Sequence, residues 1–114
     1  MKKEAIEKAI QKIAEKGKIA ASIAQLNFEK ITIERKIGKL HSRLGERIDY
    51  LFKSGEDIKE DEIVKGIIEE IRKLEARIDE IENKLKELKE KLKEHEESKV
   101  DAKGEESEEG DSEE

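Results

Sequence analysis

The two histidines of the chain, His41 and His95, are the residues best suited to bind a metal ion, because there is no cysteine. A metal site needs several ligands that converge from more than one turn of the chain. His95 lies among Glu94, Glu96 and Glu97, but nothing else converges on it, and nothing converges on His41. We therefore expect a structural or solvated role for both histidines and no bound metal.

Residue patterns for catalysis are missing as well. Asp and Glu are abundant but alternate with Lys, which is typical of solvated ion pairs and not of two carboxylates in one desolvated cleft. No base is placed to activate Ser22, Ser42 or Ser54. The sequence also contains neither the G-x-x-x-x-G-K-[ST] nor the G-x-G-x-x-G phosphate-binding pattern. We expect neither enzymatic activity nor a cofactor.

Binding to nucleic acids or membranes depends on the lysine-rich residues 1–18, which have a net charge of +3. This segment has no aromatic side chain that could stack on bases, which argues against nucleic-acid binding. Its isoleucines, Ile6, Ile10 and Ile13, could lie on an anionic membrane surface, although anchoring aromatic residues are missing there too. The membrane therefore remains only an alternative partner.

The composition favours long helices over a compact globular core. The chain has 114 residues, of which 49% are charged, 33% are hydrophobic and none is proline. A two-stranded coiled coil needs only about two apolar residues in seven, and uninterrupted helices need an absence of proline. Together with the absence of cysteine and of a continuous apolar stretch at the N-terminus, this composition predicts a soluble cytoplasmic protein of the all-α class.

The strongest structural pattern lies in residues 64–92, where apolar residues alternate at spacings of three and four. This spacing predicts four heptads of coiled coil, in a helix over about 60–97. The apolar positions are Val64, Ile67, Ile71, Leu74, Ile78, Ile81, Leu85, Leu88 and Leu92.

A matching stripe in residues 19–51 predicts a first helix over about 2–53. Gly55 suits the left-handed residue that ends a helix, so the short segment 54–59 is predicted to be a turn between antiparallel helices. Lys30 interrupts this stripe, and we interpret it as a residue that sets the register. The register that satisfies most positions pairs Leu44 with Ile67, Leu40 with Ile71, Ile37 with Leu74 and, on a flank, Glu29 with Lys84, but a register one heptad away stays open.

Charge is divided along the chain in a way that supports this hairpin. Residues 1–53 have a net charge of +6 and residues 54–97 a net charge of −6. The basic helix is thus expected to pair with the acidic one. Residues 98–114 have a further net charge of −6 with Val100 as the single large apolar residue, so we predict an acidic disordered tail after a hairpin over residues 1–97.

A column of small residues lies beside the seam of the first helix and predicts a surface for another helix. Glycine inside an exposed helix costs about 1 kcal/mol relative to alanine, so repeated glycines on one face suggest close approach by a partner. The predicted function is therefore that of a non-enzymatic scaffold or adaptor, which binds itself as a homo-oligomer or binds another helical protein. The candidate interaction face comprises Gly17, Ala20, Ala21, Ala24, Ile31, Gly38, Gly45 and Phe52.

A holdase-type chaperone is the alternative hypothesis. The predicted hairpin resembles that of prefoldin subunits in general shape, and an acidic tail would keep complexes with unfolded clients soluble. Prefoldin hairpins are joined through strand-forming segments, whereas residues 53–62 are short and polar. The sequence thus does not indicate membership of that family, and it identifies neither a partner nor the number of subunits.

Overall fold

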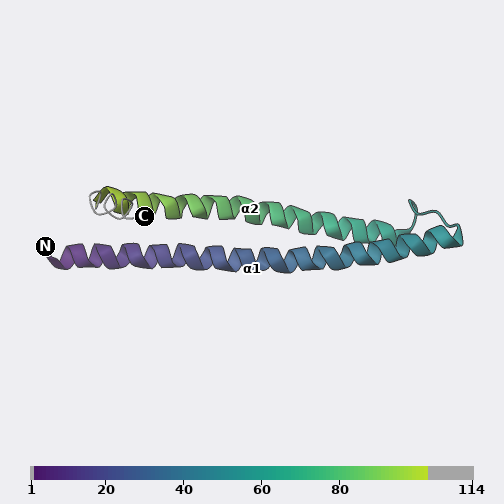
Figure 1. Cartoon of the computed structure of the whole chain (residues 1–114), viewed down its shortest axis with the longest axis horizontal. Helices are drawn as coiled ribbons and strands as arrows, with labels where there is room; N and C mark the ends of the chain where they lie inside the picture. Colours follow the sequence, from purple (N-terminus) through teal and green to yellow (C-terminus); the bar gives the residue numbers. More distant parts are fainter. Residues whose placement is uncertain (1, 103–114) are drawn as a thin grey trace, which may run out of the picture. The chain divides into compact units, whose positions relative to one another are not determined.

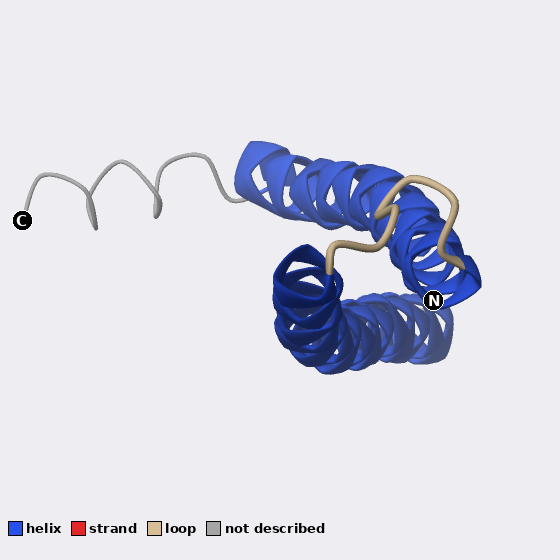
Figure 2. Ribbon diagram, turned by 90° about the vertical axis from the view of Figure 1, so that its right-hand side faces the viewer, coloured by secondary structure: helices blue, strands red, loops and turns tan. Residues whose placement is uncertain are grey.

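The computed structural model describes the backbone of residues 2–102 and the side chains of residues 2–95. Its two elements are helix α1, Lys2–Ser54, and helix α2, Glu62–Ala102 (Figure 1). Both are α-helices joined by one connecting loop, and the described residues contain no strand (Figure 2). The predicted all-α helical hairpin is therefore confirmed.

The chain divides into two compact units, each built from a stretch of both helices. The first unit combines residues 1–25 with residues 84–114, and the second comprises residues 26–83. The second unit contains the turn. We describe the two units separately.

The core of the second unit confirms the predicted register near the turn. Leu40, Ile67 and Ile71 form a buried cluster. Both members of each of the three predicted layers belong to this cluster or pack against it, since Ile37, Leu44 and Leu74 complete it. A shift by one heptad would bring Leu40 opposite Val64 or Ile78, so the alternative registers do not fit this cluster.

Helix α1 ends at a glycine, as its sequence predicts. Gly55 has a φ of 72°, in the left-handed region that side chains other than glycine rarely adopt. The Gly55 amide donates to the Phe52 carbonyl at 3.2 Å, and the Glu56 amide donates to the Leu51 carbonyl at 3.0 Å. These two bonds form a Schellman motif, which satisfies carbonyls that the helix end leaves without partners.

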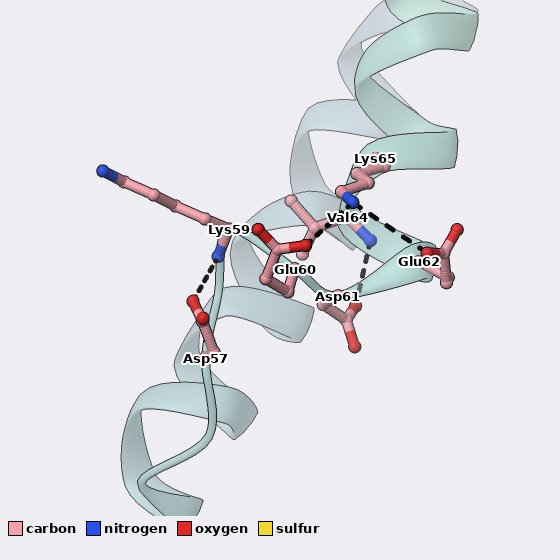
Figure 3. A network of polar contacts seen from close by, with 7 residues as sticks. All are labelled: Asp57, Lys59, Glu60, Asp61, Glu62, Val64 and Lys65. Carbon is pink, nitrogen blue, oxygen red and sulfur yellow. Dashed lines mark hydrogen bonds and ion pairs between the residues drawn. The ribbon is translucent and has the colours of Figure 1, made fainter.

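Helix α2 begins two residues later than predicted, because Asp61 caps it. The Val64 amide donates to Asp61 Oδ2 at 3.0 Å, which satisfies one of the free amides of the first turn (Figure 3). Before the cap, the Lys59 amide donates to Asp57 Oδ1 at 3.0 Å (Figure 3). The turn therefore spans residues 55–61, whereas the sequence predicts residues 54–59.

In the first unit, half-buried apolar residues line the two helices at the expected spacing. They are Ile19, Ile23, Leu88 and Leu92, and Leu85 is buried. Helix α2 continues to Ala102, beyond the end at about 97 that the sequence predicts. Residues 103–114 of the predicted disordered tail lie outside the described residues, so the prediction made for them is not tested.

Candidate interaction surface

In the second unit, helix α1 has one face that none of the described residues covers. Four members of the predicted interaction face lie here at seven-residue spacing: Ile31, Gly38, Gly45 and Phe52. All four are exposed, with Phe52 76% accessible to solvent. Phe28 is 72% exposed and lies three residues before Ile31, which places the two side chains on neighbouring parts of the helix surface.

The two glycines of this face have no packing role within the described chain. A Cβ atom built on Gly38 or on Gly45 meets no other atom within 4 Å. Neither glycine therefore permits a close approach of α2, although both lower the intrinsic stability of α1. The unused space at these two positions is the observation on which the candidate surface depends.

In the first unit, helix α1 presents a second uncovered face. The remaining predicted residues, Gly17, Ala20, Ala21 and Ala24, are all exposed. Before them in the chain, the isoleucines Ile6, Ile10 and Ile13 are 59%, 59% and 72% exposed.

The structure thus leaves every residue of the predicted interaction face exposed, but adds apolar residues that the prediction does not include. Phe28 lies four residues after Ala24 and three before Ile31, and this spacing could have identified it. The sequence links Ile6 and Ile13 only to a membrane contact. Exposed large apolar side chains at such spacing are typical of interaction surfaces, whereas single exposed ones are common.

Ion pairs fix the geometry of the second unit around this surface. Arg47 binds Asp61 through two hydrogen bonds, Nε to Oδ2 at 3.1 Å and Nη2 to Oδ1 at 2.8 Å. The Arg47 guanidinium also lies 5.2 Å from the centre of the Tyr50 ring. Hydrogen bonding from Arg47 lowers the pKa of the Asp61 carboxyl to about 2, and the amide of Val64 acts in the same direction.

A second bidentate pair joins the two helices of the second unit. Glu29 accepts two hydrogen bonds from Arg77, at 2.8 Å from Nε and 3.0 Å from Nη2, a partner that the sequence does not predict. These bonds raise the pKa of the Arg77 guanidinium above its ordinary value. The planar fork of an arginine matches both carboxylate oxygens, which an ammonium group does not, and this favours Arg77 over Lys84.

Lys30, which interrupts the apolar stripe, forms an ion pair between the helices. Its Nζ atom lies 3.1 Å from Glu82 Oε2, and its side chain remains partly exposed. A lysine in this arrangement keeps its charge in water and selects the register that brings Glu82 close.

Neither histidine belongs to a metal-binding group in the described part of the chain. His41 is exposed, and His95 Nε2 lies 3.6 Å from Glu15 Oε2. A shallow hollow in the second unit is lined by Glu34, Glu75 and Asp79 beside two isoleucines. No group of three or more His, Asp or Glu side chains in the described part of the chain could hold a metal ion.

The chain matches no protein-family model, no curated protein and no solved structure. Over the residues that the structure describes, neither helix contains a stretch long and apolar enough to cross a membrane.

Proposed function

We propose that this protein is a non-enzymatic coiled-coil scaffold that acts through helix–helix association on the uncovered side of α1. The open space at Gly38 and Gly45 is the observation that supports this function best. A partner helix needs small residues to approach closely, and nothing in the described chain uses these two. The neighbouring Ile31 and Phe52 would supply the apolar contacts.

The energetic cost of these glycines supports the proposal. Each glycine in an exposed helix lowers helix stability by about 1 kcal/mol relative to alanine. A partner that packs against the glycines would offset this cost in the assembled protein. Isolated helices gain little from propensity in any case, since tertiary packing supplies most of their stability.

The test is the double substitution Gly38→Leu with Gly45→Leu, followed by light scattering on a sizing column. Because a Cβ atom at either position has no other atom within 4 Å, the leucines fit the hairpin itself and should clash only with a partner. We expect the native chain to form an oligomer and the double variant to have a lower mass than the native chain, because association through this face is lost. Helicity measured by circular dichroism should stay the same or rise.

Gly66→Leu is the matched control. Gly66 lies on α2, is exposed, and also has open space around its Cβ position. This variant should gain helicity without any change in mass. An unchanged mass of the Gly38→Leu, Gly45→Leu protein would contradict association through this face.

A holdase-type chaperone is a second candidate, because apolar side chains are exposed on both sides of the turn. Tyr50 and Phe52 on α1 and Ile63 on α2 are all exposed. Such residues could contact unfolded clients. Suppression of thermal aggregation of a model client at equimolar protein, lost on Phe52→Ser with Ile63→Ser, would support this function, and no suppression by the native protein would exclude it.

A further inference from the structure

The exposed face of α1 in the first unit has the residue spacing of a second coiled-coil seam. Ile6, Ile10, Ile13, Gly17, Ala20 and Ala24 follow one another at alternating spacings of four and three, and all are exposed. Glu15 is about 200° from Ile13 around the helix, and its carboxylate lies 3.6 Å from His95 of α2. This second seam therefore lies on the side of α1 that faces away from α2.

The six seam residues are sorted by size along the helix. The N-terminal three are isoleucines and the C-terminal three are glycine or alanine. The seam is flanked by exposed alanines, whose small side chains leave room for a partner helix. They are Ala9, Ala14 and Ala21. A partner that fits this surface must be small opposite the isoleucines and large opposite Gly17, Ala20 and Ala24.

We propose that the partner is a second copy of this chain, bound antiparallel through this seam, with the two-fold axis crossing the seam at the level of residue 15 along the helix. The inference rests on the proposed scaffold function and specifies its partner and orientation. In this arrangement, Ile6 packs on Ala24 of the partner subunit, Ile10 on Ala20 of the partner subunit, and Ile13 on Gly17 of the partner subunit. Each layer then contains one isoleucine and one small residue.

Packing distance is the reason for choosing the antiparallel orientation. Helix axes lie about 8–10 Å apart, and the value depends on the side chains between them. A parallel pair would place isoleucine against isoleucine at one end and Gly17 against Gly17 at the other, so the helices would diverge or leave a void. The antiparallel pair keeps the volume of its layers nearly constant, which is what dense packing requires.

The charges beside the seam favour the other orientation, but weakly. A parallel pair would bring Lys2 near Glu7 of the partner subunit, whereas the antiparallel pair brings Lys16 near Lys16 of the partner subunit. Lys2 and Glu7 are exposed, where ion pairs contribute little and salt screens them. Side-chain volume therefore decides the orientation.

The size of the seam sets the expected affinity. Residues 6–24 span about 28 Å of helix, at about 1.5 Å per residue. A contact strip of that length and about 10 Å in width is small beside the roughly 800 Å² that each partner buries in a standard stable interface. We expect a reversible dimer whose population rises with protein concentration in the micromolar range.

Two single-cysteine variants of the full chain test the orientation, because the native chain has no cysteine. Ala14 lies beside the proposed two-fold axis, so Ala14→Cys should be cross-linked to itself by a short bismaleimide. Ala9→Cys is the matched control, since two copies of residue 9 would lie about 20 Å apart along the helices. Both positions are exposed alanines, so neither substitution should disturb the hairpin.

We expect at least tenfold more cross-linked dimer from Ala14→Cys than from Ala9→Cys. Equal yields from the two variants in a protein that light scattering shows to be oligomeric would overturn the antiparallel dimer and leave the scaffold function intact. A monomeric mass at all concentrations would contradict self-association altogether. Co-sedimentation with phosphatidylserine vesicles that salt abolishes, without any cross-linking, would assign the isoleucines to a membrane surface and overturn the proposal.

Discussion

The two units use the same pair of helices but differ in how much they bury. Among the described side chains, the first unit has one buried apolar residue, Leu85, and the second unit has all the others. The large apolar residues that the first unit exposes are Ile6, Ile10 and Ile13. The buried residues of the second unit are Ile33, Leu40, Leu51, Val64, Ile67, Ile71 and Ile81.

This difference separates apolar residues that stabilise the hairpin from apolar residues that contribute little to it. In the second unit the buried apolar residues stabilise the hairpin, and two bidentate ion pairs, Arg47–Asp61 and Glu29–Arg77, add geometric specificity. In the first unit Ile6, Ile10 and Ile13 contribute little to the hairpin, because most of their surface remains in water. Substitutions in the two units should therefore act on different measurements.

The largest effect is expected from a cavity in the second unit. Ile81 is fully buried, so Ile81→Ala should lower the free energy of unfolding by about 2–5 kcal/mol in urea titrations followed by circular dichroism. Ile13→Ala, in the first unit, removes the same atoms from an exposed side chain and should change this free energy by less than about 0.5 kcal/mol at concentrations where the protein is monomeric. Similar losses for both variants would contradict this separation between the two units.

The acid sensitivity of the hairpin should depend on the turn of the second unit. The pKa of the Asp61 carboxyl is lowered from 3.8 to about 2, so folding favours its charged form. This contribution to stability is complete above about pH 5 and is lost as the pH falls through 4 towards 2. Thermal unfolding should show a fall in midpoint over this range that is smaller in Asp61→Asn.

Asp49→Asn is the control for the acid effect. Asp49 pairs with Lys53 at 3.0 Å, but both side chains are largely exposed. Exposed pairs of this kind contribute little to stability. The control should therefore keep the native pH dependence, and equal flattening in both variants would show that Asp61 is not the group responsible.

The smallest effect distinguishes two glycines of the second unit by their backbone. Gly55→Ala places a side chain at a φ of 72° and should destabilise the hairpin by about 1–2 kcal/mol. Gly66→Ala lies inside α2 with open space around it and should stabilise the hairpin by up to about 1 kcal/mol. The two midpoints in urea should move in opposite directions.

The sequence predicts what depends on apolar periodicity and on glycine. The spacing of Leu40, Ile67 and Ile71 is enough to place all three in the seam, whereas the observed cluster is needed to exclude a register one heptad away. Gly55 is predicted to end α1 since only glycine adopts its conformation without strain. The column at Gly38 and Gly45 is predicted from the cost of glycine inside an exposed helix, and the sequence does not identify a partner for it.

Polar contacts could not be assigned from the sequence with the same accuracy. Glu29 can reach more than one basic residue on α2, and the bidentate geometry that selects Arg77 appears only in three dimensions. An argument from charge alone does not distinguish Glu60, Asp61 and Glu62, because each is acidic and an acidic side chain favours a helix start. Asp61 is the capping residue because its carboxylate accepts the Val64 amide, and Arg47, 14 residues earlier, binds the same carboxylate.

The short connection between the helices has a consequence for the order of folding. Arg47 and Asp61 are separated by 14 residues in sequence, whereas Glu29 and Arg77 are separated by 48. The entropy lost in closing a loop grows with its length, so contacts beside the turn should form first and shorten the loop that the next contact must close. We expect the second unit to fold from the turn outward, at a rate typical of proteins with local contacts.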